Sequence, residues 1–204
     1  MGGAEMRAVI ERAGERQVIV VDARLFSELA QTATSTGVLG VIAVPQPGST
    51  LPGPFNLLLE DVQDPGNVGT MLRTAAAAGA THAFLSAGCA FAWSPKVLRS
   101  GQGAHFFLEI VENADLPAVA SAFAGKVVAG VPRAEASLFN ADLRGPVMFM
   151  VGNEGAGLSA TLISCATARL SIPMPGGFES LNAAAATAVF LFEKLRQDRS
   201  GRSE

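Results

Sequence analysis

Hydrophobic and polar positions follow a regular pattern from residue 55 onward. Short apolar runs of four to seven residues alternate with longer stretches in which apolar residues recur at helical spacing. The first pattern is typical of strands buried in a sheet and the second of helices that cover it, so their alternation predicts βαβ units around a parallel sheet. The expected strands are 56–61, 82–86, 106–111, 126–131, 146–151 and 168–172. The expected helices are 67–78, 94–100, 115–124, 158–165 and 181–197.

Local signals mark the ends of several of these helices. Ser94 followed by Pro95 is typical of a helix start, and Gly79 is a natural stop. The last helix has one continuous apolar stripe, formed by Leu181, Ala184, Ala188, Leu191 and Leu195. Its charges cluster late, and we expect the polar tail after it to fray.

The first fifty residues have a different pattern. It predicts a strand at 18–22, a helix at 23–31 and a strand at 38–44, followed by the Pro- and Gly-rich run PQPGSTLPGP. Two strands and one helix are too few to close a core of their own. We therefore divide the chain into a partial α/β substrate-binding segment (1–48), a linker (49–54), a main α/β domain (55–198) and a tail (199–204).

Composition narrows the class of protein. With 204 residues, 49% of them hydrophobic, the chain can bury a substantial core. No apolar stretch is long enough to cross a membrane and the amino terminus lacks the apolar core of a signal peptide, so we expect a cytoplasmic protein. Cys89, Cys165, His82 and His105 lack metal-ligand spacing, which predicts neither a metal site nor a disulfide framework.

Net charge limits how the chain could bind nucleic acid. The formal charge is −3 and the sequence pI is about 5.5, which argues against binding through bulk positive charge. An RNA ligand would have to meet a local basic patch. Arg73, Lys96 and Arg99 could form such a strip.

The first segment with candidate chemistry is NVGTMLR. Asn67 can cap the helix that starts there, and Arg73 lies one turn beyond Gly69 on the same face. Because helical side chains lean toward the amino terminus, Arg73 could pass the bare Gly69 toward the unpaired N–H groups of that end and bind a phosphate. The alternative is a capped surface helix with a solvated arginine.

The second segment is GNEGAGLS, directly after the apolar run PVMFMV. Gly152, Gly155 and Gly157 indicate a sharp turn that can approach a ligand closely, with Glu154 inside it. The spacing matches neither the dinucleotide fingerprint nor a P-loop, which argues against nicotinamide cofactors and nucleoside triphosphates. A plain turn followed by a helix capped by Ser159 is the alternative.

The third segment, SIPMPGGFESLN, precedes the last helix. Its prolines prevent regular pairing and leave backbone donors and acceptors that an adenine ring could use. It also carries three polar side chains, Glu179, Ser180 and Asn182. Ser180 could instead be a helix cap.

Together the three segments are similar, in order and spacing, to the motifs of the SpoU-type (TrmH-like) RNA 2′-O-ribose methyltransferases of the SPOUT superfamily. The match is N-x-G-x-x-x-R, then G-x-E-x-x-G-L, then I-P-M-x-G-x-x-x-S-L-N. The matching residues are Asn67, Gly69 and Arg73; Gly152, Glu154, Gly157 and Leu158; and Ile172, Pro173, Met174, Gly176, Ser180, Leu181 and Asn182. The resemblance covers roughly residues 55–197, including SPKVLRSGQGAHFF at 94–107.

This resemblance implies a trefoil-knotted domain that binds S-adenosylmethionine, forms a homodimer and methylates a ribose 2′-hydroxyl in RNA without a metal. It implies catalytic roles for Arg73, Asn67, Glu154, Ser180 and Asn182. The donor pocket would be lined near Val131, Gly152, Ile172, Met174 and Leu181. Arg73 would be either a base or a clamp on the substrate phosphate, and its high pKa favours the clamp.

The amino-terminal region is where the chain departs from the family. It resembles only the second half of an RNA-binding domain that many members carry, and by that analogy rRNA is favoured over tRNA. The main alternative function is a knotted dimer that binds the donor and associates with RNA without efficient catalysis. An ordinary Rossmann-type small-molecule methyltransferase would need a Gly-rich loop after the first strand and an acidic end to the second, and the sequence has neither.

Overall fold

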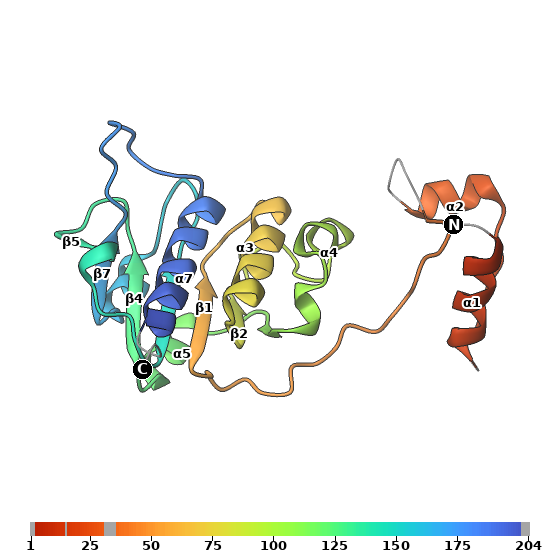
Figure 1. Ribbon diagram of the computed structural model, residues 1–204, viewed down its shortest axis with the longest axis horizontal. Helices are drawn as coiled ribbons and strands as arrows, with labels where there is room; N and C mark the ends of the chain where they lie inside the picture. The colour runs from red at the N-terminus through yellow and green to blue at the C-terminus, as the bar shows by residue number, and fades with distance from the viewer. Residues whose placement is uncertain (1–2, 15, 31–35, 201–204) are drawn as a thin grey trace. The chain divides into compact units, whose positions relative to one another are not determined.

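The computed structural model describes residues 3–14, 16–30 and 36–200. The chain divides into two compact units, Met1–Pro45 and Gln46–Glu204 (Figure 1). The second unit contains all the segments with candidate chemistry. Each unit is described by itself.

The second unit is built on a seven-stranded sheet in which every pairing is parallel. The strands follow the order β3-β2-β1-β6-β4-β7-β5. Their bounds are β1 Phe55–Leu59, β2 His82–Leu85, β3 Glu109–Val111, β4 Lys126–Gly130, β5 Ala136–Ser137, β6 Val147–Val151 and β7 Ala168–Ser171. The predicted α/β fold with a parallel sheet is confirmed, whereas the trefoil knot stays a prediction.

Helices cover both faces of this sheet. They are α3 (Pro65–Ala78), α4 (Pro95–Gly101), α5 (Leu116–Ala122), α6 (Ala160–Ser164) and α7 (Ala183–Ser200), with short 3₁₀ turns η1 (Ala104–Phe106) and η2 (Leu138–Asn140). The cores show the division: residues of α3, α4 and α7 belong to one buried cluster, and residues of α5 and α6 to the other. Within the described residues, no helix is long and apolar enough to cross a membrane.

The central strands explain the continuous apolar runs in the sequence. In β1, Leu57 and Leu59 pack into the α3/α4/α7 cluster while Leu58 points into the α5/α6 cluster. β6, its neighbour, is likewise buried throughout. A strand covered on both faces needs apolar residues at every position, so the run does not alternate with polar ones.

The parallel pairing brings the carboxyl ends of the strands to one edge of the sheet. The chain leaves β1 there toward α3, leaves β6 into the turn that carries Glu154, and leaves β7 into the loop that precedes α7. β4 ends beside β6 and β7. Segments far apart in the sequence therefore meet at the ends of β1, β6, β4 and β7, where open α/β sheets bind their ligands.

Some predicted bounds in the second unit were wrong. The strand expected at 106–111 begins only at Glu109, because Gly103 takes a left-handed φ of 87° and leads into η1. The last helix begins at Ala183, so Leu181 precedes it, and its buried face includes Thr187 and Lys194. These polar groups are tolerated there because Thr187 donates to the Ala183 carbonyl and Lys194 pairs with Asp198.

The described residues of the first unit form the helices α1 (Gly3–Ala13) and α2 (Ala23–Ala30). The strands expected at 18–22 and 38–44 are wrong: both segments are irregular and pair with no strand among the described residues, and Val20 and Val41 are 88% and 99% exposed. Apolar, β-branched composition suggested strands, but a strand also needs a partner to accept its backbone hydrogen bonds. Helix α1 was not predicted, and residue 31 of the expected helix 23–31 lies outside the described residues.

Candidate active site

Three of the predicted polar side chains, one from each motif, are joined by hydrogen bonds. The Asn182 amide donates to the Asn67 Oδ1 at 3.2 Å, and the Asn67 amide donates to the Glu154 carboxylate at 2.5 Å. Asn67 lies in the first turn of α3, Glu154 in the turn after β6, and Asn182 directly before α7. Residues separated by up to 115 positions thus form one polar chain.

The start of α7 fixes the donor-to-acceptor direction of this hydrogen-bonded series of side chains. The Asn182 Oδ1 accepts the backbone N–H groups of Ala184 and Ala185 at 2.9 and 3.2 Å, so its amide nitrogen must face Asn67. Asn67 must then present its own amide nitrogen to Glu154. Among the described residues the carboxylate of Glu154 accepts only this bond, which leaves its remaining acceptor sites for a ligand.

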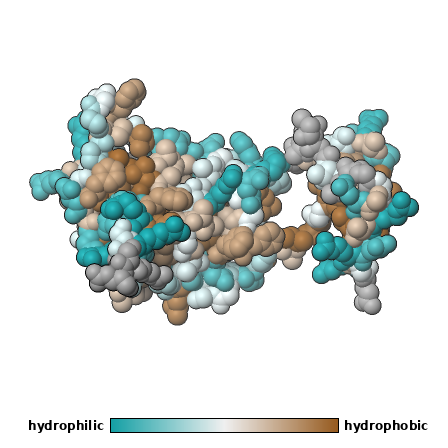
Figure 2. All heavy atoms as spheres, in the orientation of Figure 1, coloured by the Kyte–Doolittle hydropathy of each residue, from teal (hydrophilic) through white to brown (hydrophobic). Residues whose placement is uncertain are grey.

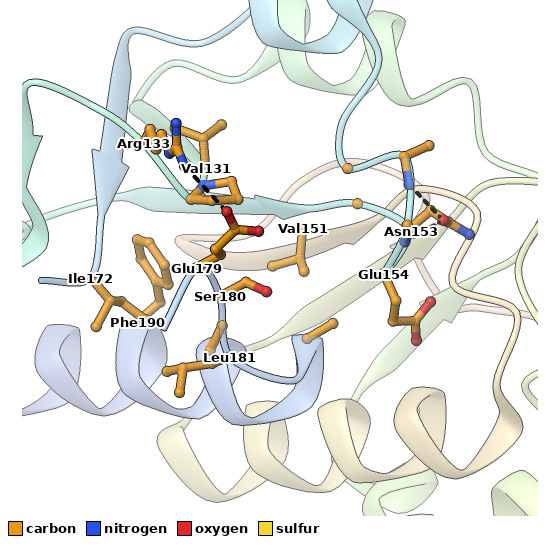
Figure 3. Close-up of a pocket in the computed structure, with 18 of the residues that line it drawn as sticks. Val131, Arg133, Val151, Asn153, Glu154, Ile172, Glu179, Ser180, Leu181 and Phe190 are labelled. Carbon is orange, nitrogen blue, oxygen red and sulfur yellow. Dashed lines mark hydrogen bonds and ion pairs between the residues drawn. The ribbon is translucent and has the colours of Figure 1, made fainter. Parts of the chain in front are cut away.

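A cavity of about 550 Å³ adjoins these hydrogen-bonded side chains (Figure 3). It lies at the carboxyl ends of β4 and β6, and the loop between β7 and α7 forms part of its wall. All five residues expected to line the donor pocket line it, namely Val131, Gly152, Ile172, Met174 and Leu181, as do Glu154 and Ser180. Its volume is within the range of pockets that bind drug-sized molecules.

Gly152 makes the turn after β6 possible. A Cβ atom at this position would lie 2.2 Å from the carbonyl carbon of Gly157 and 2.4 Å from the Leu158 nitrogen. Asn153 holds the turn in place: its side chain accepts from the N–H groups of Gly155 and Ala156 and donates to the Asp61 carbonyl. Glu154 is therefore presented by a rigid loop, and the sequence had not pointed to Asn153.

The cavity also has a charged pair that was missed. Arg133, two residues beyond Val131 in the loop after β4, lies with a nitrogen 3.6 Å from a carboxylate oxygen of Glu179. Glu179 had been noted for its polarity, but nothing around Arg133 in the sequence marked it. Its position as a basic residue directly after a predicted strand is too common a feature to identify a binding residue.

The predicted phosphate-binding residues lie on neighbouring helices outside the cavity wall. Arg73 is exposed on α3, and Lys96 and Arg99 are exposed on α4, which packs against α3. The predicted path of Arg73 over Gly69 is wrong: Gly69 is buried, and a Cβ there would lie 2.6 Å from the Val97 carbonyl oxygen of α4. Gly69 is small because the two helices touch at this point.

Two of the expected helix caps are formed by other residues. Asp64 caps α3 by accepting the Asn67 N–H at 2.8 Å, with Pro65 at the first helical position, so the Asn67 side chain is available for Glu154. Asn182, not Ser180, caps α7. The caps expected at Ser94 and Ser159 are confirmed.

Neither a reactive thiol nor a group of metal ligands is found near the strand ends among the described residues. Burial raises the pKa of the Cys89 thiol, which donates to the Leu59 carbonyl and so remains protonated. Across the part of the chain that the structure describes, no group of three His, Cys, Asp or Glu side chains could hold a metal ion. The arrangement suits a reaction that needs oriented hydrogen bonds and a bound organic molecule.

Comparison with known proteins adds independent findings. Residues 54–192 match the SpoU rRNA methylase family. The chain is 37% identical to an uncharacterized tRNA/rRNA methyltransferase of Synechocystis over 87% of this chain and 67% of that protein. It is 35% identical to the 23S rRNA (guanosine(2553)-2′-O)-methyltransferase of Bacillus subtilis over 82% and 68%.

A solved structure agrees with both. The AdoMet-bound rRNA methyltransferase from Sinorhizobium meliloti superposes with a TM-score of 0.78 at 30% identity, over 95% of this chain and 77% of that one. The chain spans between 52% and 68% of the length of curated relatives that it matches.

Proposed function

Because this chain belongs to the SpoU rRNA methylase family, we propose that it transfers the methyl group of S-adenosylmethionine to a ribose 2′-hydroxyl of RNA. The observation that carries the proposal is the hydrogen-bonded chain Asn182–Asn67–Glu154 beside the cavity. It unites one residue of each family motif at the point where a bound donor and an incoming hydroxyl would meet.

The cavity fits S-adenosylmethionine in size and in chemistry. Its apolar wall, which includes Val131, Ile172 and Phe190, suits an adenine ring, and the bare backbone of Gly152 permits close approach. Backbone groups of the loop before α7 can bond the edge of the ring. When bound, the donor supplies a methyl group on a positively charged sulfur, activated for displacement.

The polar chain accounts for the orientation of the nucleophile. In-line displacement requires the 2′-hydroxyl to be aligned with the methyl group and its proton to be accepted. Glu154 has unused acceptor sites, and its position is fixed by Asn67 and by the turn that Asn153 holds. We assign Glu154, Asn67 and Asn182 to orienting the hydroxyl, and Ser180, which lines the cavity, to the same task.

Arg73 would hold the phosphate next to the target ribose. It lies six residues beyond Asn67 on α3, about 9 Å along the axis. Within the described residues it has no hydrogen bond or ion pair, so its guanidinium is available to a phosphate. Lys96 and Arg99 on α4 would extend this basic surface for RNA.

The curated relatives favour rRNA as the substrate, since the B. subtilis protein is named for 23S rRNA. We also propose a cytoplasmic homodimer. Hydrophobic residues gather on the surface over α7 (Figure 2), and Phe192 of that helix is 46% exposed. A second copy could cover this face.

Methyl transfer is the direct test. The protein and its Arg73→Ala variant would be incubated with radiolabelled S-adenosylmethionine and with rRNA or tRNA that lacks its own modifications. We expect label in rRNA as a 2′-O-methyl nucleotide and little in the variant. Donor binding without transfer to either RNA would contradict the proposal and favour a donor-binding, RNA-associated module.

A further inference from the structure

The ion pair between Arg133 and Glu179 lies at the cavity, and it contributes too little to folding stability to explain why the two residues are there. The two side chains are 86% and 87% exposed, and exposed pairs of this kind contribute little to folding. They come from two different loops, one after β4 and one before α7, and both contribute to the cavity wall (Figure 3).

The pair also supplies one positive and one negative side chain to the cavity wall. Among the described residues that line the wall, Arg133 is the one cationic side chain, and Glu154 and Glu179 are the two anionic ones. Glu154 is held by Asn67 in the polar chain. Arg133 and Glu179 therefore form a second, separate charged pair on this wall, one of each sign.

S-adenosylmethionine has matching charges at one end. Its aminoacyl group carries a carboxylate and an ammonium on the same carbon atom. A guanidinium binds a carboxylate through two parallel hydrogen bonds, and a carboxylate accepts from an ammonium. Since the ion pair is solvent-exposed and weak, exchanging it for these two contacts would cost little.

We propose that Arg133 and Glu179 bind the aminoacyl end of the methyl donor, Arg133 through the donor's carboxylate and Glu179 through its ammonium. This inference rests on the proposed use of S-adenosylmethionine but not on which RNA is methylated. It assigns specificity to these side chains: they select a complete donor over nucleosides that share its adenine and ribose.

Two ligands separate this role from a general effect on the cavity. S-adenosylhomocysteine has the aminoacyl group, whereas 5′-methylthioadenosine has the same adenine, ribose and sulfur without it. Calorimetry would measure the affinity of both for the wild-type protein and for the Arg133→Gln and Glu179→Gln variants. Arg144→Gln is the matched control, because Arg144 also pairs with an exposed carboxylate, Asp142, and neither residue lines the cavity.

We expect each of the two variants to bind S-adenosylhomocysteine about tenfold more weakly, as is typical for loss of one charged hydrogen-bonding partner, and to bind methylthioadenosine unchanged. The control should change neither affinity. Equal weakening of both ligands would overturn the proposal and indicate that the pair only holds the two loops. Unchanged affinity for both would overturn it as well.

The same data keep this inference separate from the proposed function. If the wild-type protein binds S-adenosylhomocysteine and transfers methyl groups but the variants show no selective loss, only the role of Arg133 and Glu179 fails. If the wild-type protein does not bind S-adenosylhomocysteine, the proposed donor fails and this assignment fails with it.

Discussion

Replacing Gly152 with alanine tests the packing of the turn after β6, which carries Glu154. The added Cβ would lie 2.2 Å from the carbonyl carbon and oxygen of Gly157, about 1.2 Å short of the 3.4 Å at which ordinary contact begins. These are backbone atoms, so no flexible side chain can move aside. The turn itself would have to open.

The expected cost follows from this geometry. Forcing extra atoms into a packed site typically costs about 1–3 kcal/mol. For a domain of this size, each kcal/mol lowers the melting temperature by roughly 2–4 °C, so we expect a fall of roughly 2–12 °C. Because the same turn lines the cavity and carries Glu154, binding of S-adenosylhomocysteine should weaken too.

Gly155→Ala is the matched control in the same turn. Its added Cβ would meet only the Asn153 side chain, at 3.4 Å, and its φ is not in the left-handed region. Thermal melting and calorimetry of both variants would decide the matter. A Gly152→Ala protein that melts and binds like the wild type would refute the close packing described for this turn.

Three further outcomes are expected. Asn67→Asp places a second carboxylate against Glu154 and should lower the rate of methyl transfer about 10²-fold, as misplacing a reacting group can. Asn140→Asp makes the same charge change at an exposed residue of η2 and should leave the rate unchanged. Equal rates in the two variants would contradict the role of the polar chain. Lys96→Gln and Arg99→Gln should each weaken RNA binding and reduce the salt dependence of its affinity by about one unit of slope, measured by filter binding across salt concentrations, and an unchanged slope would remove α4 from the RNA surface. Burial lowers the pKa of His82, an effect partly opposed by Glu109. The stability that neutral His82 provides is therefore present above the ordinary histidine pKa of about 6.5 and is lost as the pH falls below it. The melting temperature should drop between pH 7.5 and 5.5, less steeply in His82→Asn, and parallel pH profiles of the two proteins would show that His82 does not cause the drop.

The sheet and its helices could be predicted because burial leaves a direct pattern in the sequence. Strands such as β1 and β6, covered on both faces, must be apolar throughout, and Ser94-Pro95 and Ser159 mark helix starts through local hydrogen bonds. In the first unit the same reasoning was wrong, because pairing depends on a partner strand. The apolar residues of 18–22 and 38–44 cannot by themselves specify one.

At the site, the motifs singled out Asn67, Glu154 and Asn182, which do lie together, but not how these residues share their hydrogen bonds. Asp64 followed by Pro65 is the same signal as Ser94-Pro95 and could have identified the cap of α3. Two features depend on three-dimensional packing: Asn182 caps α7 in place of Ser180, and Gly69 contacts α4. Arg133 lies at the site because β4 pairs with β6 and β7, and this strand order could not be predicted from the residues around Arg133.

Asn182 has two tasks, and this affects how relatives of the chain should be compared. Its Oδ1 caps α7 and its amide reaches Asn67. A helix cap is worth about 1 kcal/mol, enough for selection on folding alone to retain the residue. Under the proposed function, a relative that had ceased to methylate RNA would still be selected for a capping residue at this position, so an asparagine there is weaker evidence of activity than Asn67 and Glu154.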